Sequence, residues 1–158
     1  AIYGNPFYAV MSSGNSAERR KILEGLGAKV ILVPQVDGTP GKVTGKDIQA
    51  ATEEAIVLSQ RYQGFYCDQF NNLSSIIAHQ RTTGPEIYSK LQGNIHGFVA
   101  AVGSGGTFLG TSGYLKSKDS KIHCVAVEPF GAEVLGRKPV VKPQHIIQGI
   151  GYGFVPPH

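Results

Sequence analysis

The segment of this sequence with the clearest chemistry is a short glycine-rich stretch, GSGGT, at residues 103–107. It directly follows an apolar, strand-like run, FVAAV, at residues 98–102. Glycines can adopt positive φ angles and let the backbone approach an anion, and the N–H groups that open a helix point at the bound oxygens. The hydroxyls of Ser104 and Thr107 add two more donors. The segment therefore predicts a phosphate cradle between a strand and a helix.

The spacing of these residues narrows the kind of phosphate site. No Gly-Lys-Ser/Thr ends the loop, so it is not a Walker A loop, and its glycines are too close together for the dinucleotide fingerprint. A monophosphate therefore suits it better than a pyrophosphate. The alternative is a strand-to-helix turn without a ligand, which three glycines and two hydroxyls in five residues fit less well than a single glycine does.

The elements that would position this loop alternate along the chain. Strand-like runs occur at residues 7–11, 29–34, 65–70, 98–102 and 122–129, and helical patterns at 17–25, 46–63, 73–80, 84–91 and 107–116. The last thirty residues are rich in Gly and Pro and carry no long periodic run. This alternation predicts an α/β fold with open, mostly parallel twisted sheets and helices on both faces.

Composition limits the classes of function. Hydrophobic residues make up 41% and charged residues 16% of the 158 residues, which is globular composition. The net charge of +4 comes from scattered lysines, which argues against nucleic-acid binding. No apolar run approaches the ~20 residues of a membrane span.

The cysteines and histidines do not predict a metal site. Cys67 and Cys124 form no CxxC pair and are expected to be buried free thiols in a cytosolic setting. The histidines are not spaced as metal ligands.

Several further motifs occur in a fixed order around the glycine loop. They are SAERRKILEGLGAK at residues 16–29, DQFNN at 68–72, RTTGPEI at 81–87, VAVEP at 125–129 and HIIQGIGYG at 145–153. Together with the loop they resemble the cysteine synthase / cystathionine β-synthase family, which are fold-type II enzymes that use pyridoxal 5'-phosphate. The resemblance runs from about Phe7 to Pro156.

The resemblance implies a set of site residues. Gln69 would bind the carboxylate of a small amino-acid substrate, although it could instead satisfy backbone groups. Gly149 and Gly151, in the QGIG segment, would lie beside the cofactor ring, although this stretch could be an ordinary turn. No catalytic residue and no metal ligand is assigned. The residues implied to bind the cofactor phosphate are Gly103, Ser104, Gly105, Gly106 and Thr107.

The implied activity is β-replacement on serine or an O-activated serine, forming cysteine or a related amino acid. The alternatives are a cystathionine β-synthase-like enzyme, a truncated non-catalytic module that binds pyridoxal phosphate, and an unrelated nucleotide-binding domain. The intact enzyme is expected to be a homodimer, and the location is expected to be cytoplasmic. Residues 1–65 would be the tail of a small domain, and residues 66–158 the first part of a large one.

The family's cofactor-attaching lysine is not found in this sequence, so the stretch alone is expected to be inactive. Two segments imitate missing parts of the site. Residues 12–15 (SSGN) imitate the family's asparagine loop, and Lys46 imitates the lysine. By their register with the resemblance, we expect an ordinary turn and a solvated lysine.

Overall fold

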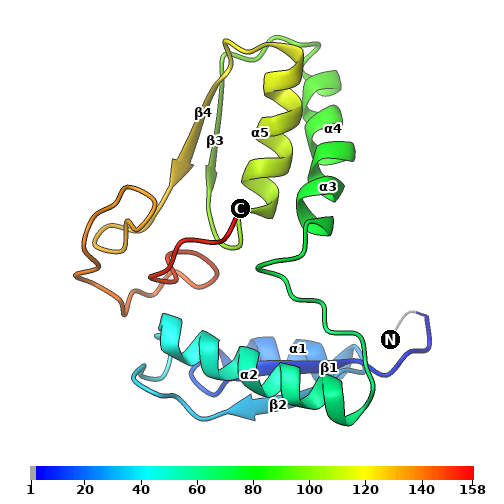
Figure 1. Cartoon of the computed structure of the whole chain (residues 1–158), viewed down its shortest axis with the longest axis vertical. Coiled ribbons are helices and arrows are strands. Elements are labelled where there is room, and N and C mark those ends of the chain that lie inside the picture. Colours follow the sequence, from blue (N-terminus) through cyan, green and yellow to red (C-terminus); the bar gives the residue numbers. More distant parts are fainter. Residues whose placement is uncertain (1–2) are drawn as a thin grey trace. The chain divides into compact units, whose positions relative to one another are not determined.

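The computed structural model describes residues 3–158 of the chain, which divide into two compact units. The first unit comprises the chain through Tyr66 together with Val140–Gln148. The second comprises Cys67–Pro139 and Gly149–His158. Figure 1 shows the course of the chain, and each unit is described by itself.

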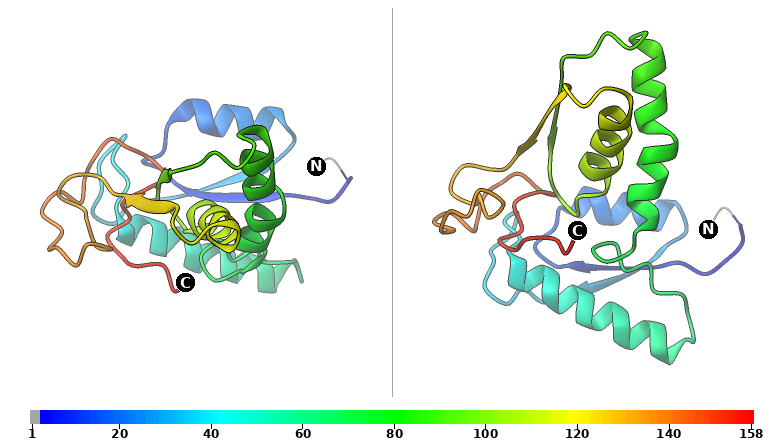
Figure 2. Two further views of the ribbon diagram at one scale, coloured as in Figure 1. Left: turned by 90° about the horizontal axis from the view of Figure 1, so that it is seen from above. Right: turned by 45° about the horizontal axis from the view of Figure 1, so that its top comes forward.

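The first unit is built on a pair of parallel strands, β1 (Tyr8–Ser12) and β2 (Lys29–Val33). Their register pairs Tyr8 with Lys29 and Ser12 with Val33. Helix α1 (Ala17–Gly25) connects the strands, and α2 (Gly45–Arg61) follows them. Figure 2 shows α1 and α2 on opposite sides of the strand pair. This arrangement is a crossover unit with both faces covered, as in parallel sheets generally.

Helix α2 begins at a capping box in which Thr44 and Asp47 bind each other's backbone N–H. The fully buried Asp47 carboxylate also accepts hydrogen bonds from the backbone N–H groups of Val36 at 2.6 Å and Asp37 at 3.4 Å. Burial by itself raises the pKa of Asp47, but these hydrogen bonds outweigh burial and hold the pKa below its ordinary value. One ionised side chain therefore fixes both the helix start and the loop after β2.

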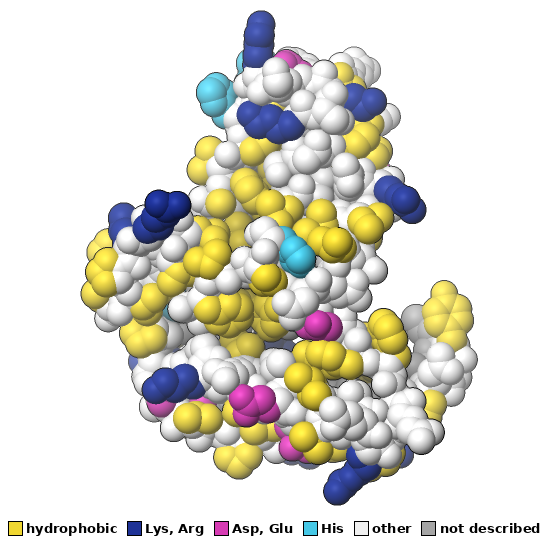
Figure 3. Space-filling model, in the orientation of Figure 1, with side chains coloured by type: hydrophobic (Ala, Val, Ile, Leu, Met, Phe, Trp, Pro, Cys, Tyr) yellow, Lys and Arg dark blue, Asp and Glu magenta, His cyan; other side chains and the backbone are white. Residues whose placement is uncertain are grey.

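The second unit also contains a parallel strand pair, β3 (Gly97–Ala101) and β4 (His123–Val127). Helix α5 (Gly106–Lys118) connects these strands and packs against β3. Helices α3 (Ser74–Arg81) and α4 (Thr83–Lys90) pack against α5. Figure 1 shows these helices on one side of the pair. Hydrophobic side chains gather over the strands in Figure 3. The exposed hydrophobic residues of the two strands include Val99, Val125 and Val127.

The contact between α3 and α5 depends on glycine. A Cβ at Gly106 would collide with the Ser75 hydroxyl, and a Cβ at Gly110 would collide with the carbonyl oxygen of Ile76. The two helices therefore approach more closely than side chains would allow. Deeper along α5, Thr111 and Leu115 are completely buried.

The predicted fold class is confirmed, because parallel strands alternate with helices in both units. The predicted strand at residues 65–70 is wrong. Asp68 has a φ of 44°, and its carbonyl oxygen accepts hydrogen bonds from the N–H groups of Asn71 at 3.0 Å and Asn72 at 2.8 Å. The segment is thus an extended connection ending in a turn, where the chain leaves the first unit for the second.

Candidate functional site

The predicted phosphate loop lies between β3 and α5. The last ladder bond of the strand pair runs from the N–H of Val102 to the carbonyl oxygen of Val127 at 3.2 Å. The chain then turns at Gly105, whose φ is 93°, and Gly105 is the N-cap of α5 without any side-chain capping bond. The first N–H groups of a helix have no intrahelical acceptor, so they are available to an anion at this end of α5.

The glycines of the loop are required for two different reasons. Gly105 is needed for its left-handed backbone. Gly103 and Gly106 are needed because other groups occupy the space of a side chain. A Cβ at Gly103 would collide with the carbonyl oxygen of Gly149, and a Cβ at Gly106 would collide with the Ser75 hydroxyl. Close packing therefore explains part of this glycine pattern. From the sequence alone, the pattern indicated only anion binding.

The contact of Gly103 with Gly149 brings two predicted site segments together. Gly149 and Gly151 have φ angles of 99° and 66°, so both need the left-handed backbone that favours glycine. The next residue, Tyr152, has its hydroxyl 3.6 Å from the position that a Cβ on Gly103 would take. Residues 149–153 therefore border the loop at Gly103.

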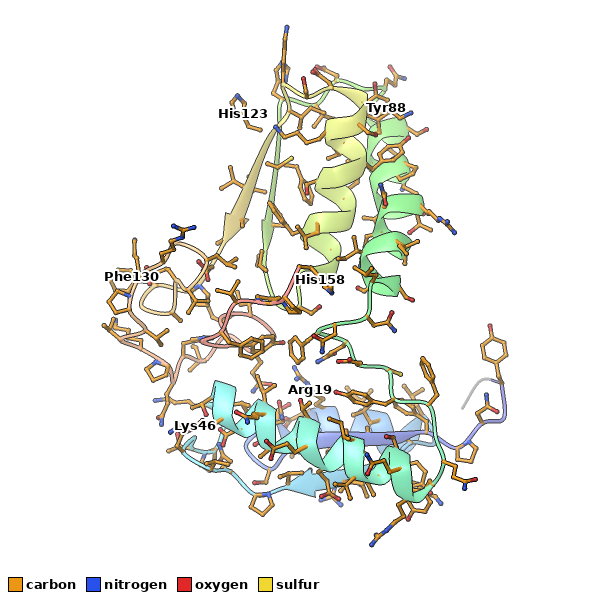
Figure 4. The ribbon with its side chains drawn as sticks, in the orientation of Figure 1. Arg19, Lys46, Tyr88, His123, Phe130 and His158 are labelled. Atoms are coloured by element: carbon orange, nitrogen blue, oxygen red, sulfur yellow. The ribbon has the colours of Figure 1, made fainter. Side chains whose placement is uncertain are left out.

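The segment containing Gln69 is joined to the same region by aromatic packing. The ring of Phe70 lies edge-on to those of Tyr152, at 5.5 Å between centroids, and Phe154, at 5.2 Å. His158, labelled in Figure 4, donates from Nε2 to the carbonyl oxygen of Asn71 at 2.9 Å. Gln69 itself is exposed, and its amide makes no hydrogen bond in the part of the chain that the structure describes. The second unit thus gathers all three predicted segments.

One residue of this region was missed by sequence reasoning. His79, on α3, has Nδ1 2.8 Å from the hydroxyl of Thr83 and Nε2 3.1 Å from that of Thr107. It therefore connects the TTGPEI motif to the loop and fixes the Thr107 side chain. The spacing of His79 and Thr83 on neighbouring helical turns is visible in the sequence. The contact with Thr107 is long-range and has no local signal.

The two imitating segments lie in the first unit. Residues 12–15 form a tight turn after β1, in which Ser13 N–H donates to the carbonyl oxygen of Val33 at 2.8 Å. Lys46, labelled in Figure 4, opens α2 with 70% of its side chain exposed and an ion pair of 3.2 Å to Asp37. Both are thus the ordinary turn and the solvated lysine that were expected.

Other candidate groups have structural roles or none. Glu128, in the VAVEP motif, accepts from the N–H groups of Leu135 at 3.0 Å and Gly136 at 3.1 Å and so organises the loop after β4. Both cysteines are free, but Cys67 is exposed and Cys124 is only half-buried, so the expectation that both are buried is wrong. Residues 3–158 contain no cluster of side chains that could hold a metal ion and no helix long and apolar enough to cross a membrane.

Comparison with known proteins defines the class. A family model described as pyridoxal-phosphate dependent enzyme matches residues 1–158, and the chain belongs to this family. It is 39% identical, over 142 residues, to an O-acetylserine dependent cystathionine beta-synthase of Bacillus subtilis, covering 89% of this chain and 42% of that one. It is 37% identical to cysteine synthase A of Escherichia coli, covering 99% of this chain and 48% of the relative.

The fold is likewise that of the family's fold-type II enzymes. The crystal structure of cysteine synthase from Entamoeba histolytica superposes with a TM-score of 0.80 at 34% identity, covering 98% of this chain and 43% of that one. The chain therefore spans less than half the length of these relatives.

Proposed function

We propose that residues 103–107 bind the phosphate of pyridoxal 5'-phosphate. The observation that carries this proposal is the uncapped start of α5 behind the left-handed Gly105. The loop fits a phosphate ester, because its N–H groups lie at a helix N-terminus and Ser104 and Thr107 supply hydroxyls. His79 holds one of these hydroxyls in place. The proposed contacts are the backbone of Gly103, Gly105 and Gly106 and the side chains of Ser104 and Thr107.

The neighbouring segments complete the proposed site. Gly149 and Gly151 would lie beside the cofactor ring, which is supported by the close approach of Gly149 to Gly103. Gln69 would bind the carboxylate of a small amino-acid substrate through its exposed amide. The packing of Phe70 on Tyr152 supports this assignment, since it ties the Gln69 segment to the same part of the second unit.

The activity proposed for the protein is β-replacement on serine or an O-activated serine, giving cysteine or a related amino acid. Relatives named cysteine synthase and O-acetylserine dependent cystathionine beta-synthase support it. The cofactor, when bound, supplies the electron sink for this chemistry. The residues of this chain would hold the phosphate and the substrate carboxylate and so orient the substrate for reaction.

The domain assignment, the assembly and the compartment are proposals as well. The first unit would be part of the family's small domain and the second part of its large domain, which the division after Tyr66 supports.

A homodimer is supported by exposed apolar side chains such as Val99 and Val125. Sedimentation velocity would test it. The free thiols Cys67 and Cys124 support a reducing, cytoplasmic compartment.

The test of phosphate binding uses pyridoxine 5'-phosphate, which carries the ring and the phosphate but no aldehyde that could react with lysines. We expect the chain to bind this ester in calorimetric titration and to bind pyridoxine, without the phosphate, much more weakly. Thr107→Val should weaken binding of the ester by roughly 10-fold or more, because hydrogen bonds to charged groups contribute about 1.5–3 kcal/mol.

The matched control is Ser112→Ala. It removes a hydroxyl from the same helix, where Ser112 donates to the carbonyl oxygen of Leu109. This change should leave the affinity for the ester unaltered. Equal affinity of the wild-type chain for pyridoxine and its phosphate ester would show that the loop is not a phosphate site.

A further inference from the structure

The hydroxyl of Tyr152 borders the first residue of the phosphate loop. It lies 3.6 Å from the position of a Cβ on Gly103, an ordinary contact distance. Gly103 has no side chain, and the carbonyl oxygen of Gly149 and the hydroxyl of Tyr152 lie on that side of it. The hydroxyl is therefore the part of the Tyr152 side chain that lies next to the loop.

The ring that carries this hydroxyl is held on its apolar sides. Tyr152, Phe70 and Phe154 form a cluster that we call the aromatic trio. Tyr152 stacks on Phe154 with 5.8 Å between centroids and an interplanar angle of 18°, and it meets Phe70 edge to face at 5.5 Å. Stacked and edge-to-face aromatic pairs attract each other beyond the burial of their surface. The trio thereby limits where the hydroxyl can go.

A phenol beside the loop is suited to binding an anion. A tyrosine hydroxyl carries one proton and can donate one hydrogen bond. The loop would supply donors from its N–H groups and from two hydroxyls, and all of them lie on the strand–helix turn itself. Tyr152 would add a donor from a segment more than forty residues later, on the Gly103 side.

We propose that Tyr152 is a ligand-binding residue whose hydroxyl donates a hydrogen bond to an oxygen of the phosphate held at residues 103–107. This inference rests on the proposed function and adds a specific contact to it. The QGIG segment then has two tasks. Its glycines turn the backbone beside the loop through their left-handed conformations, and Tyr152, directly after it, contacts the anion.

The test compares Tyr152→Phe with the wild-type chain in calorimetric titrations with pyridoxine 5'-phosphate and with pyridoxine. Phenylalanine keeps the ring of the trio and removes only the hydroxyl. We expect the dissociation constant for the ester to rise about 10-fold and that for pyridoxine to stay the same, because the lost bond is made to a charged group.

Tyr88→Phe is the matched control. Tyr88 also packs edge to face against another aromatic ring of the second unit, that of Tyr114 at 6.3 Å, but its hydroxyl lies beside Gly93. This change should leave both constants unaltered.

The outcomes separate this inference from the proposal beneath it. If the wild type binds the ester and Tyr152→Phe binds it equally well, Tyr152 does not contact the phosphate and only this inference fails. If Tyr152→Phe weakens pyridoxine and its ester by the same factor, the hydroxyl acts elsewhere and the inference is again overturned. A wild type that does not distinguish the ester from pyridoxine overturns the proposed function, and this inference with it.

Discussion

The imidazole Nε2 of His79 lies 3.1 Å from the hydroxyl of Thr107, a residue 28 positions later in the chain. The other ring nitrogen is engaged by Thr83, so the histidine cannot turn without breaking a second bond. A neutral imidazole carries one proton, so one threonine donates to the ring and the other accepts from it. Thr107 keeps its proton for an anion when Nε2 carries the ring hydrogen and Nδ1 accepts from Thr83. Thr107 thereby has a fixed rotamer before any anion arrives.

Replacing His79 by alanine should therefore weaken binding of pyridoxine 5'-phosphate by about 3- to 10-fold, the value of a neutral hydrogen bond. His79 would act through Thr107, so the double variant His79→Ala/Thr107→Val should be no weaker than Thr107→Val alone. His123→Ala is the control, since His123 is exposed at the far end of β4. Additive losses in the double variant would contradict this positioning role.

Acid should destabilise the first unit through Asp47. Its pKa is lowered on folding from the ordinary value of 3.8, so the unfolded state binds the proton more tightly. The stability that this carboxylate contributes is complete above pH 3.8 and is lost as the pH falls through the folded-state pKa. Denaturant unfolding of Asp47→Asn at neutral pH should show a loss of roughly 1–3 kcal/mol.

The same variant should also show a flatter dependence of unfolding free energy on pH in this acid range. Glu53→Gln, on the exposed side of the same helix, should keep the wild-type slope. If Asp47→Asn and the wild type lose stability in parallel on acidification, protonation of Asp47 is not the cause of the acid destabilisation.

Thr111 is expected to be a site where the protein gains stability by losing a polar group. Its side chain is completely buried, and its hydroxyl has no hydrogen-bond partner in residues 3–158. Thr111→Val has nearly the same shape and should raise the unfolding free energy by about 1 kcal/mol. Thr111→Ser retains the hydroxyl, loses a methyl group and should be destabilising. A valine variant less stable than the wild type would mean that the hydroxyl is satisfied.

Two glycines of α5 should respond to alanine with opposite signs. Gly106→Ala places a methyl group against the Ser75 hydroxyl, so it should destabilise the contact between α3 and α5. Gly113→Ala meets nothing within 4 Å and should stabilise the helix by roughly 0.5–1 kcal/mol. Thermal unfolding measures both. Equal shifts of the same sign would contradict the close approach of the two helices.

Elements with strong local signals could be predicted from the sequence. Helix α1 has the predicted bounds, because Ser16 caps it and Gly27, with a φ of 87°, follows its end. The strand predicted at residues 65–70 failed for a non-local reason. Aromatic residues favour a strand only where a neighbouring strand accepts its hydrogen bonds, and here the chain is a connection between units.

In the candidate site, too, local features could be predicted from the sequence and long-range contacts could not. The phosphate loop is local, and its residues and turn are apparent from GSGGT. The neighbours of the loop are not local, since His79, Ser75 and Tyr152 reach it from other elements. Sequence order carries no signal for these approaches, because helix packing and the aromatic trio create them.

The assignment of residues 140–148 to the first unit has a consequence for how the protein can be divided. The chain enters the second unit after Tyr66, returns to the first for this stretch and leaves again at Gly149. Gln144 secures the stretch by donating to the carbonyl oxygen of Asp37 at 2.8 Å. Neither unit is thus a continuous piece of polypeptide, and no single cut releases one intact.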